Sequence, residues 1–325
     1  MCLAAWCIAL CSGHHVRATD TSDRSVEAKK ISTPNLPNAF RITEKIVSGG
    51  LPEGPAAFEE LRQLGVKTII SVDGAKPNIQ LAANFGMRYV HLPHGYDGIA
   101  DERVLQLAKA VQDLPGPIYI HCHHGKHRSP AAAAVVAISL NRIPQEQAIH
   151  ILEIAGTSPE YRGLYESVRK ARPRTPEELD TVPADFPTIA KLPEMAESMV
   201  ALEGTLYRLQ RASKAGWNTV VGDPDIDQAH EALLLREHYT ELLRTESVKK
   251  MSSAFGDLMR QAETEATALE NSLRDANATK DENHSALTEL LNAVQDNCVR
   301  CHRQFRDIPL SEKSLLVPSN PNSRR

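Results

Sequence analysis

The segment from Pro117 to Leu140 constrains the fold of this chain more than any other. It opens with a short β-branched and aromatic run, PIYIH, and closes with a very Ala-rich run that begins at Pro130, so it predicts a strand followed by a helix. Proline is favourable as a first helical residue. The short loop between the two elements therefore aims backbone N–H groups and the positive end of a helix at one point, which is a binding site for phosphate.

The side chains in this loop suit phosphoryl chemistry. A helix N-terminus favours the thiolate of Cys122, which is the nucleophilic form. The guanidinium of Arg128 can hold two phosphate oxygens with its fork of donors. Ser129 can donate to the sulfur and assist its release, and Gly125 permits a backbone geometry that a Cβ would hinder.

The spacing His-Cys, five residues, Arg-Ser resembles the signature of the protein tyrosine phosphatase superfamily. The resemblance extends over residues 40–172 and is closest to the compact dual-specificity type. It implies that Cys122 is the nucleophile, Arg128 binds phosphate, Ser129 aids turnover and His121 holds the cysteine in place. It also implies that the rest of the loop binds substrate, namely His123, His124, Gly125, Lys126 and His127.

Relatives of this kind use an aspartic acid on a preceding loop as general acid. Asp97 follows the predicted strand 87–92 and lies 25 residues before the cysteine, so it is our choice. Asp101 is the alternative, although a role as helix N-cap would explain it equally well. Asp73, or no acid at all, is the remaining possibility.

Two other chemistries compete for the loop. The histidines around Cys122 could hold a metal ion, but adjacent residues of one tight loop cannot all face a single ion. A cysteine in an anion-binding loop could also carry a persulfide for sulfur transfer. The excess of His and Lys suggests a highly anionic substrate, so we expect either a phosphorylated protein or a polyphosphorylated small molecule.

The pattern on either side of the loop predicts an α/β domain. Short apolar runs alternate with helical periodicity, which indicates a mostly parallel sheet with flanking helices. Strands are expected at 67–72, 87–92 and 117–121, and helices at 56–64, 79–84, 101–114, 130–140, 145–155 and 160–171.

The chain changes character after this domain. A Pro-rich stretch at 173–190 reads as a linker, and four amphipathic helices within 191–308 predict an all-α bundle. Residues 309–325 are polar and are expected to form a disordered tail. The predicted fold class is thus α/β plus an all-α four-helix bundle.

The fourth of these helices carries CVRCH at positions 298–302, the attachment motif of a c-type haem. Cys298 and Cys301 would bind the vinyl groups and His302 the iron; a disulfide or half of a zinc site is the alternative. The arrangement resembles the class II cytochromes c of the cytochrome c′ type, which implies His302 as proximal ligand and a homodimer formed through the bundle. Met195 and Met199 could approach the iron, but core packing explains them as well.

The N-terminus suggests export. A short apolar run from Leu3 to Cys11 followed by VRA resembles a signal peptide at residues 1–18, with a linker at 19–39. A lipoprotein reading at Cys11 fits less well because Leu10 is large. Haem c is attached outside the cytoplasm, so we expect the bacterial periplasm. With a net charge of −4, the chain has no basic surface for nucleic acid, and it shows no transmembrane run.

The sequence therefore predicts a phosphatase that needs no cofactor at its own site, fused to a haem module. The haem could regulate the phosphatase through its redox state or a bound gas, although a fusion by itself shows only that the two are close. The alternative is a non-enzymatic haem protein, either an electron carrier with a redox partner or a sensor, whose N-terminal domain binds anions or transfers sulfur. The intact Cys122, Arg128 and Ser129 favour the enzyme.

Overall fold

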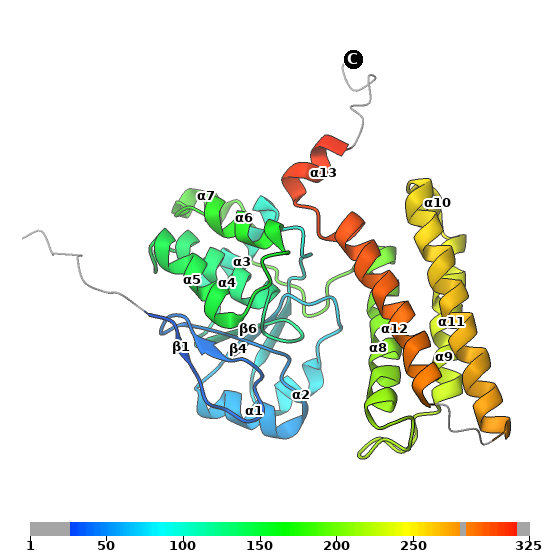
Figure 1. The fold of residues 1–325 in the computed structure, drawn as a ribbon. Helices are drawn as coiled ribbons and strands as arrows, with labels where there is room; N and C mark the ends of the chain where they lie inside the picture. The colour runs from blue at the N-terminus through cyan, green and yellow to red at the C-terminus, as the bar shows by residue number, and fades with distance from the viewer. Residues whose placement is uncertain (1–26, 280–283, 317–325) are drawn as a thin grey trace, which may run out of the picture.

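The computed structural model describes residues 27–279 and 284–316. They form an α/β domain and a separate bundle of helices, which stand side by side (Figure 1). The predicted signal peptide lies outside the described residues.

A six-stranded sheet with the order β1-β2-β3-β6-β4-β5 forms the centre of the α/β domain. The pairs β3–β6, β6–β4 and β4–β5 are parallel, whereas the pairs β1–β2 and β2–β3 are antiparallel. The strand that leads into the phosphate loop, β6, lies between two parallel neighbours, so the loop emerges at the middle of the carboxyl edge. The strands are β1 Lys29–Lys30, β2 Phe40–Arg41, β3 Ile46–Gly49, β4 Thr68–Ser71, β5 Arg88–His91 and β6 Ile118–His121.

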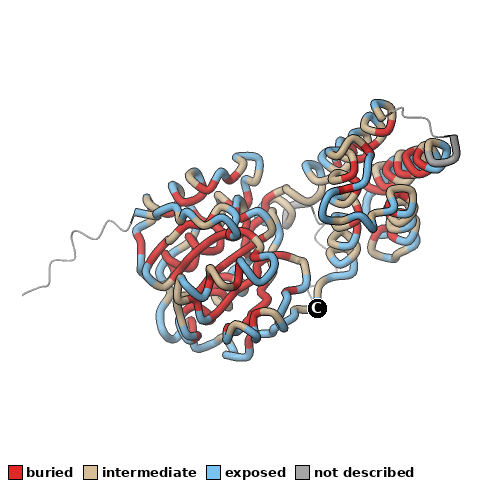
Figure 2. The backbone as a smooth tube through the Cα atoms, turned by 90° about the horizontal axis from the view of Figure 1, so that it is seen from below, coloured by how far each residue is buried: buried red, intermediate tan, exposed pale blue. Residues whose placement is uncertain are grey.

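Helices cover both faces of the sheet. One face packs on α1 (Gly54–Gln63) and α2 (Ile79–Asn84), and the other on α3 (Asp101–Asp113), α4 (Arg128–Ser139), α5 (Gln145–Ala155) and α6 (Arg162–Lys170). Every residue of α4 is buried. Figure 2 shows that buried residues, drawn red, fill the interior of this domain. Four consecutive alanines at 131–134 keep the side chains in the middle of α4 small, which lets the helix that follows the loop sit deep in the domain.

The domain begins earlier than residue 40. Strand β1 lies inside the predicted linker 19–39 and pairs with β2, and Leu36 and Ala39 are buried. The prediction failed for the described part of that linker because a two-residue strand of lysines has no apolar alternation.

The Pro-rich stretch 173–190 also belongs to the surface of this domain. It contains α7 (Pro176–Asp180), which starts with a capping box between Thr175 and Glu178. Further along, His91 N–H donates to the carbonyl of Pro187 at 2.8 Å, and its Nδ1 accepts from the N–H of Ala190 at 3.1 Å. The stretch is therefore packed against the sheet rather than a free linker.

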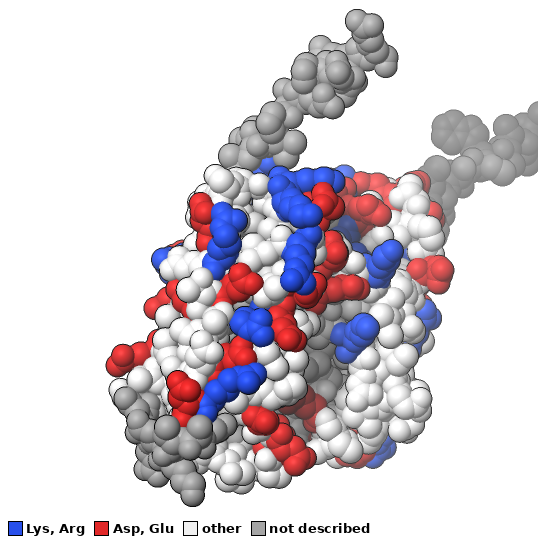
Figure 3. Space-filling model, turned by 90° about the vertical axis from the view of Figure 1, so that its right-hand side faces the viewer, with Lys and Arg blue, Asp and Glu red and all other residues white. Residues whose placement is uncertain are grey.

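The helical region is an antiparallel bundle in which each long helix packs against two others. Its core includes Leu209, Leu235, Ala266 and Val294. The long helices are α8 (Glu194–Lys214), α9 (Gln228–Arg244), α11 (Ser253–Thr279) and α12 (His284–Cys301), with a short α10 (Glu246–Lys249) and a π-helical turn η1 (His302–Arg306). The face of the bundle in Figure 3 mixes both signs of charge.

The predicted disordered tail is wrong at its beginning. Residues Leu310–Leu316 form α13, which lies between the two parts of the molecule in Figure 1. Its anchors lie in the α/β domain: the N–H of Leu310 donates to the carbonyl of Asp97 at 2.9 Å. None of the described helices is both long and apolar enough to cross a membrane.

Candidate active site

Three carbonyl groups of the loop from Cys122 to His127 accept hydrogen bonds from residues outside the loop. The carbonyl of His123 accepts from the N–H of Leu51 at 2.9 Å, and that of Gly125 accepts from Nδ2 of Asn38 at 3.0 Å. The Lys126 carbonyl accepts from the hydroxyl of Thr157 at 2.6 Å. In a planar trans peptide the N–H points opposite to the carbonyl. The amides that follow these three carbonyls therefore face the inside of the loop, where they can hold an anion.

Gly125 is required for this loop. Its φ is +72°, a conformation that side chains rarely adopt, and a Cβ would lie 2.5 Å from the backbone nitrogen of Gly50. The expectation that Gly125 serves the backbone geometry is thus met by two independent constraints.

The thiol of Cys122 lies at the base of the loop and is 3% exposed. Its Sγ is 3.3 Å from the hydroxyl oxygen of Ser129, which in turn donates to the carbonyl of Gly49 at 2.9 Å. The second bond holds the serine oxygen beside the sulfur. Because the hydroxyl has one hydrogen, it must turn that hydrogen from Gly49 to Sγ in order to donate to the sulfur.

Arg128 is buried and is held by two groups. One terminal nitrogen donates to a carboxylate oxygen of Asp73 at 2.9 Å, and the guanidinium lies 4.6 Å from the centre of the Tyr96 ring. Burial acts to raise the pKa of Asp73, but the charge of Arg128 and the N–H of Ala75 outweigh it and the pKa is lowered. The Arg128 Nε is buried and has no partner among the described residues.

His121 supports the cysteine from the strand side. Its Nδ1 is 3.2 Å from the carbonyl of Cys122, and its Nε2 is 2.6 Å from the hydroxyl of Tyr89. Burial lowers the pKa of His121 to about 4, so the ring is neutral at pH 7. It can therefore donate one hydrogen bond and accept one, as the two contacts require.

The other histidines add less positive charge than their number suggests. Burial lowers the pKa of His127 to about 4 and also lowers that of His124. His127 packs on Tyr161 with 4.7 Å between ring centres, and His123 lies 6.4 Å from the ring of Tyr207 on α8. Near pH 7 the dependable cations of the loop are Lys126 and Arg128.

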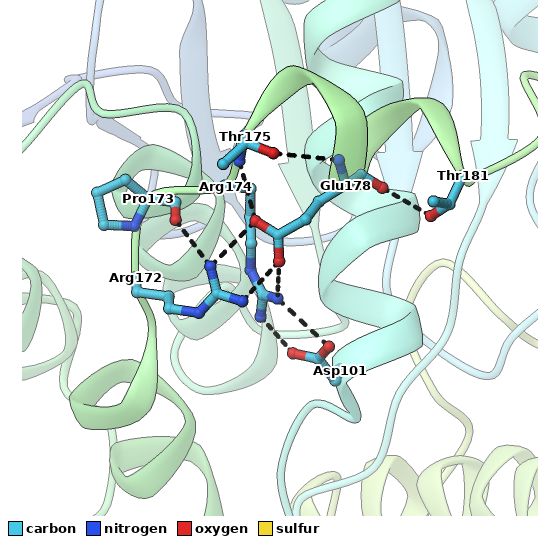
Figure 4. A network of polar contacts seen from close by, with 7 residues as sticks. All are labelled: Asp101, Arg172, Pro173, Arg174, Thr175, Glu178 and Thr181. Atoms are coloured by element: carbon cyan, nitrogen blue, oxygen red, sulfur yellow. Dashed lines mark hydrogen bonds and ion pairs between the residues drawn. The ribbon is translucent and has the colours of Figure 1, made fainter.

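Asp97 lies in the loop after β5, beside Tyr96, as the sequence suggested. Its carboxylate is 2.8 Å from Nζ of Lys313, a contact that the sequence did not predict. The expectation for Asp101 as N-cap is wrong. Ala100 takes the cap position with an extended backbone, and Asp101 is the first residue of α3, where it pairs with Arg174 (Figure 4).

Of the three acids that the sequence offers, Asp73 is the one in contact with Arg128. Its position after β4 places it at the same carboxyl edge as the loop after β6, which is the signal that could have singled it out. Its lowered pKa makes it an orienting carboxylate for Arg128 rather than a proton donor.

The CxxCH motif lies at the end of α12 on the bundle core. Cys301 is buried, and Sγ of Cys298 is 3.3 Å from the hydroxyl of Tyr239. Burial raises the pKa of Cys301 to about 11 and lowers that of His302 to about 3, so the imidazole is neutral. Met195 and Met199 pack against the same core.

Among the described residues, no set of three His, Cys, Asp or Glu side chains is arranged to hold an ion. This result concerns both the histidines around Cys122 and a zinc site that would use the CxxC motif.

Comparison with known proteins relates the N-terminal half to phosphatases. No family model matches the sequence. The chain is 27% identical over 161 residues to the dual specificity protein phosphatase TpbA of Pseudomonas aeruginosa (strain UCBPP-PA14), over 49% of this chain and 72% of the relative. TpbA from a second strain of P. aeruginosa, ATCC 15692, is 26% identical over the same shares.

Two solved structures are similar to the same half. A crystal structure of P. aeruginosa TpbA has a TM-score of 0.40 and 23% identity, covering 48% of this chain and 94% of that chain. The core catalytic domain of the PP-IP phosphatase SIW14 from S. cerevisiae, in complex with citrate, has a TM-score of 0.38 and 14% identity, covering 46% and 93%.

The N-terminal part is a cysteine-based phosphatase domain, and the chain is a phosphoric-monoester hydrolase. None of these relationships extends to the helical region.

Proposed function

We propose that the enzyme works through a phosphocysteine intermediate formed on Cys122. The sulfur attacks phosphorus, the bond from phosphorus to the leaving oxygen breaks, and Asp97 gives that oxygen its proton. Water then attacks the phosphocysteine with Asp97 as base, and Ser129 assists release of the sulfur. The observation that carries this proposal is the buried thiol, 3.3 Å from the Ser129 hydroxyl, inside a loop in which the carbonyls of His123, Gly125 and Lys126 are turned outward.

Charge on the transferring phosphoryl group would be stabilised from two sides. The inward amides of the loop act as preorganised donors, and the guanidinium of Arg128 supplies a full charge. Asp73 and Tyr96 fix the guanidinium before substrate arrives, so its orientation is settled by folding.

Hydrolysis of aryl phosphates by the full-length chain tests this mechanism. We expect Cys122→Ser to abolish turnover. Asp97→Asn should lower kcat/KM on phenyl phosphate by about 10²-fold or more, with a smaller loss on p-nitrophenyl phosphate, because general acid catalysis matters most for a poor leaving group. Full activity of Cys122→Ser would refute the nucleophile, and an unchanged ratio of the two substrates in Asp97→Asn would refute the acid.

For the substrate we propose a phosphorylated protein side chain rather than a polyphosphorylated small molecule. The lowered pKa values of His124 and His127 leave the loop with few cations, and Glu203 on α8 lies close enough to influence His124 electrostatically. A neighbouring carboxylate disfavours a substrate with several phosphates. We expect kcat/KM to be higher for a phosphotyrosine peptide than for an inositol polyphosphate, and the reverse order would support the small molecule.

We propose that the helical region binds haem covalently. Cys298 and Cys301 are free thiols on the core side of one helix, and the neutral imidazole of His302 is the form that binds a metal. These residues would hold the group, which would supply an iron centre able to change redox state or bind a diatomic gas. A pyridine haemochrome spectrum and the intact mass of the exported protein test this. Loss of the covalent mass in Cys298→Ala/Cys301→Ala is expected, and its absence in wild type would refute the proposal.

Export to the periplasm is part of the same proposal, because haem c is attached outside the cytoplasm. Fractionation of cells that express the full chain checks it. Protein found in the cytoplasm without covalent haem would contradict both the location and the attachment. A redox partner and a homodimer through the bundle remain proposals that depend on the haem.

A further inference from the structure

The loop that carries Asp97 is held from outside its own domain. Lys313 contacts the Asp97 carboxylate at 2.8 Å, and the N–H of Leu310 donates to the Asp97 carbonyl at 2.9 Å. Both residues belong to what we call the C-terminal segment, residues 306–313, which follows the CxxCH motif. The segment therefore contacts the side chain and the backbone of the same aspartate.

The neighbouring Tyr96 is contacted by the same segment. Two guanidinium groups lie over its ring, that of Arg128 4.6 Å and that of Arg306 4.3 Å from the ring centre. A cation over an aromatic face is attractive. One ring thus joins the phosphate-binding arginine to the end of the bundle.

Contacts on α6 dock the segment independently of Lys313. Arg162 holds the carboxylate of Glu312 with two bonds of 2.7 and 3.0 Å, and Ser311 donates to Glu166 at 2.8 Å. Loss of the Lys313 contact alone would leave these anchors in place, which makes the contact separable from the docking.

We propose that Lys313 is a positioning residue that restrains Asp97, so that the helical region limits the acid-dependent step of the phosphatase. The inference rests on the proposed role of Asp97 as general acid. An acid must come within about 3 Å of the leaving oxygen to transfer a proton. Lys313 holds Oδ2 of Asp97, so this oxygen can move to the leaving oxygen only after the pair breaks.

The restraint is connected to the CxxCH end of the bundle through the chain itself. Arg306 closes the π-helical turn that begins at His302, and its carbonyl accepts from Nζ of Lys313 at 2.9 Å. A shift of this turn would move the atom on which Lys313 rests. The segment is therefore placed to pass a change at His302 to the acid loop.

The test compares two substrates in the full-length chain. In Lys313→Gln we expect kcat/KM on phenyl phosphate to rise by about 2- to 5-fold, the effect of losing one partly exposed ion pair, with less change on p-nitrophenyl phosphate. Lys313→Arg should keep most of the restraint. Glu312→Gln weakens the docking on α6, but Glu312 does not contact Asp97. It should leave the ratio of kcat/KM on phenyl phosphate to kcat/KM on p-nitrophenyl phosphate unchanged.

The double variant Asp97→Asn/Lys313→Gln separates this inference from the proposed function. If Asp97 is the acid, the gain disappears in the double variant. The restraint is overturned if the kcat/KM on phenyl phosphate, divided by that on p-nitrophenyl phosphate, stays the same or falls in Lys313→Gln. It is also overturned if this ratio rises equally in Glu312→Gln. A ratio unaffected by Asp97→Asn alone overturns the role of Asp97 instead.

Discussion

Removing Asp73 from its ion pair with Arg128 should lower stability strongly, because the buried guanidinium would lose its counter-charge. The side chains are 8% and 10% exposed, and the two atoms are 2.9 Å apart. Removing one partner of a buried pair costs about 3–5 kcal/mol. Asp73→Asn keeps an acceptor oxygen but loses the charge, so we expect the free energy of unfolding to fall by about 2–3 kcal/mol.

The pair between Asp101 and Arg174 provides a matched control. Asp101 is 69% exposed, and Arg174 keeps a second carboxylate partner in Glu178 when Asp101 loses its charge (Figure 4). Asp101→Asn should cost no more than about 1 kcal/mol. Urea unfolding followed by far-UV circular dichroism measures both variants. The urea midpoint followed by the fluorescence of Trp217, which is buried in the bundle, should be the same in both variants as in wild type.

The pH dependence gives the sign of the effect. The pKa of Asp73 is lowered in the folded state from its ordinary value of 3.8, so its charge stabilises the fold above pH 3.8. This contribution is lost as the pH falls through the lowered pKa. Wild type and Asp73→Asn should therefore differ by a constant amount near neutral pH and converge in strong acid. Equal costs for Asp73→Asn and Asp101→Asn at pH 7 would refute the reasoning.

Gly125→Ala should lower the free energy of unfolding by about 2 kcal/mol or more, because the residue has a φ of +72° and the new Cβ would meet the nitrogen of Gly50; chemical denaturation measures it. Ser129→Ala should slow release of the phosphocysteine by about 10- to 100-fold while the initial burst of phenol persists, and quench-flow with intact mass detects the intermediate. No accumulation would contradict the role of the hydroxyl. The folded-state pKa of His121 and of His127 is about 4, below the 6.5 of an unfolded histidine, so the unfolded chain binds more protons between these values. Urea midpoints should therefore fall as the pH drops from about 6.5 to about 4, and a flat profile would contradict the neutral histidines.

Local patterns were sufficient for most elements. The predicted bounds of α2 and α5 are the observed ones, and the predicted strands 67–72 and 87–92 agree with β4 and β5 to within a residue at each end. Short, periodic segments bounded by turn residues report their own structure. The strand, loop and helix around Cys122 are contiguous in the sequence, so this part of the site could be predicted as well.

Contacts between distant segments could not be predicted from the sequence. Asp73 and Arg128 are 55 residues apart, and Asp97 and Lys313 are 216 apart. A charged residue has the same appearance in a sequence whether it meets solvent or a partner. The short α13 was missed for the same reason, since its anchors lie on the other domain.

The contacts that close the phosphate loop decide where a minimal catalytic fragment can start. Gly50 donates to the carbonyl of Pro37 at 2.7 Å, and Asn38 reaches both Gly125 and Ala155. A polypeptide cut at Phe40 would keep the whole signature motif and lose these ties. A fragment made for expression should therefore begin before Lys29, because residues that hold the phosphate loop precede residue 40, where the sequence motifs place the start of the domain.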